Sequence, residues 1–134
     1  MPTTKIIQFF KAVLLVPKFL KAMRLHSERH MDEAIRLFEE VAAAAEVPLH
    51  FAMLGTAYVR AGKGDLSRRP FERAVKLATG RDPGSRYIRQ YSGVYLAILD
   101  QVENIEPLIR EAHAIKCGEW LRRWLPLPPT KGYQ

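Results

Sequence analysis

The sequence predicts an all-α protein built from antiparallel helix pairs, and three observations support this. Apolar residues recur at intervals of three and four along most of the chain, and no stretch shows the apolar–polar alternation of a half-buried strand. Prolines and glycines fall mainly between the periodic segments, where turns are expected. The length of 134 residues suits one domain, and a single cysteine excludes an intrachain disulfide framework.

The first predicted element is an apolar and basic helix over residues 1–14. Its apolar run ends at Val16 and contains Gln8 and Lys11, so it is too short for a membrane span and too interrupted for a signal peptide. We therefore expect a cytoplasmic protein, with the inner face of a membrane as an alternative site. Plotted as one helix, the N-terminal apolar residues spread almost all round, which is typical of a buried helix.

Three placements of this N-terminal helix stay open. It could pack on its own domain, contact a protein partner, or lie on an anionic membrane surface. For the last two placements the expected contact residues are Lys5, Phe9, Phe10, Lys11, Lys18 and Lys21.

The following helices are predicted from periodicity and from their end signals. A helix over 32–45 begins with Asp32 and Glu33, whose charge suits a helix N-terminus. A helix over 48–61 begins at Pro48 and is closed by Gly62. After a turn at 62–65 we expect helices over 69–78, 86–100, 106–118 and 119–125, with a loop at 80–85.

One 34-residue window resembles a tetratricopeptide repeat. Its first helix carries the pattern Phe51-x-x-Leu54-Gly55-x-x-Tyr58, and Ala57, Gly62, Phe71 and Ala74 fall at the spacings that this repeat expects. The best match covers 48–81, and weaker repeats flank it within 15–117. The resemblance implies a short α-solenoid over 15–117, preceded by the helix of 1–14 and followed by a capping helix and proline-rich tail over 118–134.

The resemblance also implies a function. Tetratricopeptide domains are non-catalytic interaction modules that bind a partner segment in a concave groove, so an adaptor or an accessory subunit of a larger assembly is expected. The carboxylate clamp of some members is not reproduced, because only Arg86 supplies an expected charge. Carrying over the groove positions gives Phe19, Met23, Leu49, Ala52, Thr56, Val59, Arg86, Arg89 and Leu96. A partner with apolar and acidic character would suit them.

The net charge of +7 is concentrated in two segments. Residues 1–30 carry six bases and one acid, and residues 66–90 carry seven bases and two acids. Sequence-independent nucleic-acid binding is a third and weaker hypothesis, because no nucleic-acid-binding motif accompanies the charge.

No catalytic residue, metal site or cofactor is predicted. Gly55 and Gly62-Lys63 lack the spacing of a phosphate-binding loop, and His26 and His30 have no identifiable third ligand. The tail segment Arg123-x-x-Pro126-x-x-Pro129 fits a ligand pattern for aromatic-lined grooves, although so short a pattern often occurs by chance. Trp120 and Trp124 are expected to hold the last helix on the stack or on a partner.

Overall fold

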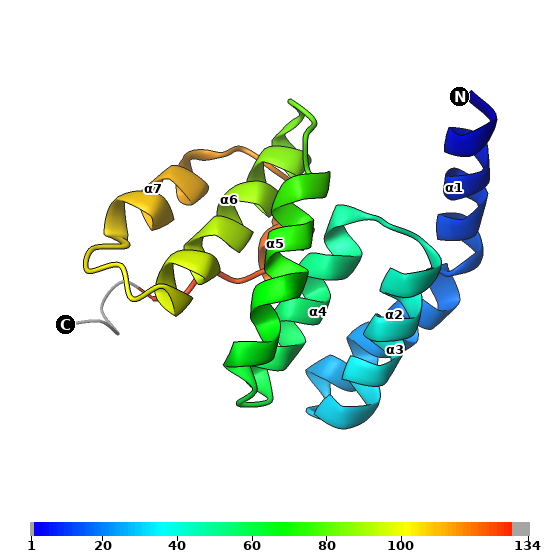
Figure 1. Cartoon of the computed structure of the whole chain (residues 1–134), viewed down its shortest axis with the longest axis horizontal. Helices are drawn as coiled ribbons and strands as arrows, with labels where there is room; N and C mark the ends of the chain where they lie inside the picture. The colour runs from blue at the N-terminus through cyan, green and yellow to red at the C-terminus, as the bar shows by residue number, and fades with distance from the viewer. Residues whose placement is uncertain (1, 130–134) are drawn as a thin grey trace.

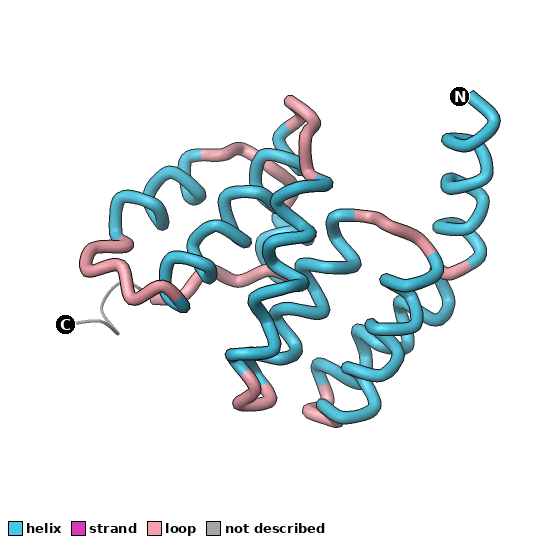
Figure 2. Tube along the Cα trace, viewed as in Figure 1, coloured by secondary structure: helices cyan, strands magenta, loops and turns pink. Residues whose placement is uncertain are grey.

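The computed structural model describes residues 2–129, and every regular element within that range is helical (Figure 2). The all-α prediction is therefore confirmed for this part of the chain. The elements are α1 (Pro2–Leu14), α2 (Val16–Ser27), α3 (Met31–Ala44), α4 (Pro48–Arg60), a 3-10 turn η1 (Gly64–Ser67), α5 (Arg68–Leu77), α6 (Pro83–Leu99), α7 (Glu106–Ala114) and α8 (Glu119–Trp124).

The break between α1 and α2 follows from Pro17. Proline has no backbone N–H and its ring clashes with the preceding turn, so a continuous helix through this position is disfavoured. The chain keeps helical hydrogen bonds on both sides, from the Leu15 N–H to the Lys11 carbonyl at 3.1 Å and from the Phe19 N–H to the Leu15 carbonyl at 2.8 Å. The two helices consequently separate at Leu15, and α1 leaves the rest of the molecule at an angle (Figure 1).

Helices α2, α4 and α6 end in the same type of turn. After α4, the Lys63 N–H donates to the Tyr58 carbonyl and the Gly62 N–H to the Val59 carbonyl, which is a Schellman motif. Gly62 takes the left-handed backbone conformation that this motif requires, with φ of 76°. Arg29 after α2 and Gln101 after α6 take the same conformation, with φ of 65° and 57°.

Helix α6 begins earlier than the predicted start at residue 86, so the predicted loop over 80–85 is partly wrong. The Asp82 carboxylate caps the helix by accepting hydrogen bonds from the Ser85 N–H at 3.0 Å and from Ser85 Oγ at 2.8 Å. Pro83 follows directly, in the first turn, where its missing N–H removes no helical hydrogen bond. The predicted turn at 62–65 likewise runs into η1.

Consecutive helices from α2 to α7 lie side by side, and α4 also contacts α6 (Figure 1). Their shared core contains the fully buried Phe38, Phe71 and Tyr91. The close approach of α4 and α5 depends on Gly55, because a Cβ atom at this position would lie 2.7 Å from the Phe71 ring. Gly55 belongs to the repeat pattern found in the sequence, and its contact with the Phe71 ring explains why this position needs a glycine.

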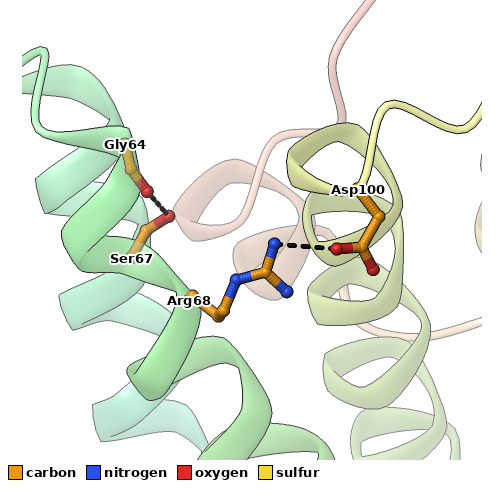
Figure 3. Close-up of polar contacts among 4 residues, drawn as sticks. All are labelled: Gly64, Ser67, Arg68 and Asp100. Atoms are coloured by element: carbon orange, nitrogen blue, oxygen red, sulfur yellow. Dashed lines mark hydrogen bonds and ion pairs between the residues drawn. The ribbon is translucent and has the colours of Figure 1, made fainter.

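A polar link joins the first turn of α5 to the end of α6 (Figure 3). The Arg68 guanidinium donates to the Asp100 carboxylate at 2.7 Å, and the neighbouring Ser67 hydroxyl donates to the Gly64 carbonyl within η1. Ser67 is fully buried, so its short side chain is accommodated by this local hydrogen bond. The Arg68–Asp100 ion pair therefore connects the start of α5 to the end of α6.

Candidate interaction site

Three of the nine predicted groove residues are buried. Phe19, Ala52 and Thr56 expose 6% or less of their surface. Thr56 Oγ1 donates to the Ala52 carbonyl at 2.8 Å and lies 2.7 Å from the Tyr91 hydroxyl. Ala52 and Thr56 are part of the core and are not available to a partner at the surface, which corrects the expectation from the repeat positions. Phe19 is nearly as buried, but it lines an apolar cavity.

The C-terminal segment of the chain covers this part of the predicted groove. Leu121 and Leu125 are buried in the main core. The Trp124 ring lies edge-on against the Phe19 ring, with centroids 5.8 Å apart, and the Tyr87 hydroxyl donates to the Leu125 carbonyl at 2.6 Å. Helix α8 therefore bridges α2 and α6. Trp124 makes the predicted contact with the stack, whereas Trp120 is exposed.

The other six predicted groove residues do not share one surface. Met23, Leu49, Val59 and Leu96 are half-buried. Arg86 and Arg89 line a separate cavity of about 300 Å³ together with Glu111. Arg89 is already engaged, because its guanidinium donates to the carbonyls of Ala78 and Gly80.

The N-terminal helix presents the largest group of exposed apolar side chains in the described residues. Within α1 the exposed residues Ile6, Phe9, Phe10 and Val13 recur at the spacing of one helix face. Thr4, Gln8 and Lys11 recur on the opposite face, with Lys5 beside them. The helix is amphipathic, so the all-round apolar distribution is wrong. That plot continued one helix through the break at Leu15.

An apolar cavity of about 310 Å³ lies between α1 and the rest of the protein. The most polar of its lining residues is His50, whose Nδ1 donates to the Ala45 carbonyl at 3.1 Å. Burial lowers the pKa of His50, and the Ala45 hydrogen bond only partly opposes this, so the ring is neutral at pH 7. The lining residues are Phe9, Val13, Val16, Phe19, Leu20, Leu49, His50 and Trp124.

We use the name N-terminal face for this cavity together with the exposed apolar side of α1. Sequence reasoning identified Phe9, Phe19 and Leu49 but missed Val13, Leu20 and Trp124. The spacing of Phe9, Val13, Val16 and Leu20 was a usable signal, because these positions recur at intervals of four, three and four. No pattern in the N-terminal sequence could indicate that Trp124 lines this cavity, because Trp124 lies near the other end of the chain.

Basic side chains flank the N-terminal face. Lys5, Lys11, Lys18 and Lys21 are all exposed, and Lys18 forms an ion pair with Glu40 at 3.3 Å. The first acidic residue in the sequence is Glu28, so no carboxylate precedes the end of α2. The exposed lysines therefore make the electrostatic potential around α1 positive, which favours a negatively charged partner.

Three of the seven basic residues in the second basic segment, 66–90, make contacts within the protein. Arg68 pairs with Asp100 at 2.7 Å, Arg73 pairs with Glu46 at 2.7 Å, and Arg89 donates to backbone carbonyls. These side chains connect helices, which is a sufficient physical reason for their presence.

The part of the chain that the structure describes contains no group of three or more histidine, cysteine or acidic residues that could hold a metal ion. His26 is buried and its pKa is lowered to about 4 by burial and by Arg60, so it is neutral at pH 7 rather than a charged helix end. Cys117 is half-buried. Pro126 of the proline-rich pattern is half-buried, and residues 130–134 of the tail lie outside the described residues.

None of the described helices is both long enough and apolar enough to span a membrane. Comparisons of the chain with protein-family models, with curated proteins and with solved structures gave no match.

Proposed function

We propose that the protein is a non-catalytic interaction module, an adaptor or accessory subunit, that binds a partner protein through the N-terminal face. The observation that carries the proposal is the uncovered apolar side of α1, where Phe9 and Phe10 expose 66% and 59% of their surface. Water-exposed apolar side chains gathered on one helix favour association, because burying them releases roughly 25 cal/mol per Å².

The partner that fits this face is an amphipathic helix with apolar and acidic residues. Its apolar side chains would enter the cavity between Phe9, Leu20 and Leu49, and helix-in-groove binding uses anchors at this spacing. Its carboxylates would lie near Lys5, Lys11 and Lys21, whose charge is not opposed by any acid before Glu28. The proposed binding site therefore lies at α1, and not in the groove that the sequence predicted.

The tetratricopeptide resemblance supports the same class of function. Of the residues that carry the resemblance, Leu54, Ala57, Phe71 and Ala74 are buried, and Gly55 faces the Phe71 ring. The common turn after α2, α4 and α6 is what a stack of similar helix pairs would contain. We infer a short α-solenoid that serves as a scaffold, with α8 capping its inner side.

The test compares proteins that co-purify with the wild-type chain and with a Phe9→Ser/Val13→Ser variant at native expression level. We expect the variant to lose its acidic helical partner while its far-UV circular dichroism and melting temperature stay unchanged, because both side chains are already exposed. Val102→Ser is the matched control for the valine change, since Val102 and Val13 expose 47% and 48% of their surface and Val102 lies far from α1 in the chain. Retention of the same partners by the double variant would exclude the N-terminal face.

A second candidate function is attachment to an anionic membrane surface through the same helix. It is favoured by one specific observation: α1 is amphipathic, with lysines on its polar side and two phenylalanines on its apolar side. We expect flotation with vesicles that contain anionic lipid and none with neutral vesicles, and a loss of flotation in Lys5→Gln/Lys11→Gln. Equal flotation with both vesicle types would exclude an electrostatic attachment.

A further inference from the structure

Two cavities beside the C-terminal ends of α2 and α4 share His26, Ser27 and Arg60. Their volumes are about 410 and 370 Å³. We call them together the arginine pocket. Its remaining lining residues are Met23, Arg24, Arg29, Met31, Arg123 and Trp124.

Four arginines line the arginine pocket, and no acidic residue is among its described lining residues. Arg123 forms an ion pair with Glu119 at 3.6 Å on the exposed surface of α8. Arg24 and Arg60 stand in the last turns of α2 and α4, where positive charge complements the helix dipole. Arg123 stands in the last turn of the short helix α8, so the same explanation covers it. The explanation does not extend to Arg29, which stands in the turn after α2.

Arg29 occupies a position that normally belongs to glycine. It stands in the left-handed conformation directly after α2, with φ of 65°, where a Cβ atom is sterically disfavoured. The turn therefore holds an arginine at the arginine pocket in spite of this steric cost. Strained positions of this kind are concentrated at sites that bind ligands.

His26 adds a polar group that the protein itself leaves unsatisfied. Its side chain is 4% exposed, and its Nε2 atom is buried with no hydrogen-bond partner among the described residues. A buried ring nitrogen without a partner is destabilising. The atom has almost no exposed surface, so a ligand oxygen would reach it only after a shift of the ring toward the cavities. A neutral imidazole with its proton on Nε2 donates to a ligand oxygen.

We propose that the arginine pocket binds the phosphoryl group of a small phosphate ester, whose apolar or aromatic body lies against Met23 and Trp124. Guanidinium groups bind phosphate through paired hydrogen bonds, and several of them can share one phosphoryl group. The volumes of the two cavities lie within the range of small-molecule sites. The arginine pocket shares Trp124 with the N-terminal face, and its other lining residues are different.

Titration calorimetry of the full chain at constant ionic strength tests this proposal, with inorganic phosphate and phenyl phosphate as the probes. We expect saturable binding of both, with phenyl phosphate bound more tightly, and no heat from phenol alone. In a Trp120→Phe background, Trp124 is the one remaining tryptophan and its fluorescence should follow the same binding curve. The absence of saturable binding for both phosphates would overturn the proposal and leave the arginines as helix-end charges.

Variants locate the site. Arg24→Gln and Arg60→Gln should each weaken phenyl phosphate binding roughly 10-fold, since each removes a charge-assisted contact. Arg36→Gln is the matched control, because Arg36 is exposed on α3 and does not line either cavity. Equal weakening in Arg36→Gln would show nonspecific charge attraction and would overturn the proposal.

A second readout separates binding from a change in folding. Burial and the positive charge of Arg60 hold the pKa of His26 at about 4, and a bound phosphoryl group would raise it. Titration of the His26 ring by NMR, with phosphate and with chloride at equal ionic strength, should show the rise only with phosphate. Phe9→Ser should bind phenyl phosphate normally, so failure of the proposed partner interaction and failure of this site can be told apart.

Discussion

At the scale of single residues, Gly55 has a strict packing requirement, because it faces a fully buried ring. An added methyl group would lie 2.7 to 2.9 Å from three atoms of the Phe71 ring. That ring is fully buried and stacked on Tyr95 with centroids 5.2 Å apart, so it has little room to move.

Gly55→Ala should therefore lower the free energy of unfolding by about 1–3 kcal/mol, which is the usual cost of overpacking. Gly93 lies in the interior of α6, and a methyl group added there would meet nothing within 4 Å. Gly93→Ala should be neutral or slightly stabilising, because alanine favours the helix. Urea denaturation of both variants checks the prediction, and equal effects at the two positions would contradict it.

His26 couples stability to pH. Burial and the Arg60 charge lower its pKa from 6.5 to about 4, so the folded protein keeps this ring neutral where the unfolded chain protonates it. Unfolding thus takes up a proton between pH 6.5 and 4. The stability contributed by the neutral ring is present above pH 6.5 and is lost as the pH falls through this window.

Over that window His26 should account for a loss of about 3 kcal/mol in the free energy of unfolding. His50, whose pKa is also lowered, adds in the same direction. Denaturation at several pH values should give a shallower pH dependence for His26→Leu than for the wild type. His30→Leu is the control, because His30 is exposed, and a parallel pH dependence of wild type and His26→Leu would count against the assignment.

At the scale of helices, local sequence signals predicted most of the boundaries. The predicted 32–45, 48–61 and 69–78 correspond to α3, α4 and α5 with shifts of about one residue at each end. Acidic residues mark the start of α3, and proline and glycine mark the start and end of α4. The start of α6 was missed because Asp82 and Pro83 form a start signal that was assigned to a loop. The N-terminal helix was predicted over 1–14, but its amphipathic character was missed.

The three similar turns differ in how well the sequence announces them. Gly62 marks the turn after α4, whereas Arg29 and Gln101 take the same left-handed conformation without being glycine. The hydrogen bonds reveal the equivalence, as in the pair from Gln101 to Ile98 and from Val102 to Ala97. A search of the sequence for glycine therefore finds the turn after α4 and misses the turns after α2 and α6.

Gln101→Gly should stabilise the protein by about 1 kcal/mol, because glycine relieves the steric cost of the left-handed conformation. Gln101→Ala is the control: it removes the same side chain but keeps a Cβ atom, so little change is expected. Thermal denaturation of the two variants distinguishes backbone relief from loss of side-chain contacts. An equal gain in both would show that the backbone conformation is not the cause.

At the scale of the whole molecule, α8 connects parts of the chain that the sequence could not place together. It brings Trp124 against Phe19 of α2 and places the Leu125 carbonyl on the Tyr87 hydroxyl of α6. These contacts join residues far apart in the sequence, and periodicity carries no information about them. For this reason the groove was predicted open, and the cavity between α1 and the rest of the protein was not predicted.

If α8 ties the two ends of the helical array together, a defect in it should weaken the whole fold and not only the C-terminus. Leu125 is fully buried in the main core with residues of α2 through α6. Leu125→Ala should lower the free energy of unfolding by about 2–5 kcal/mol, the cost of emptying a buried leucine site. Trp120→Ala, on the exposed side of α8, should cost about 0.5 kcal/mol or less.

Hydrogen exchange locates the effect of Leu125→Ala. Amides of α2 should lose protection together with those of α6, because both helices contact the C-terminal segment. Loss of protection confined to α8 would mean that this segment merely covers the array and does not hold it together.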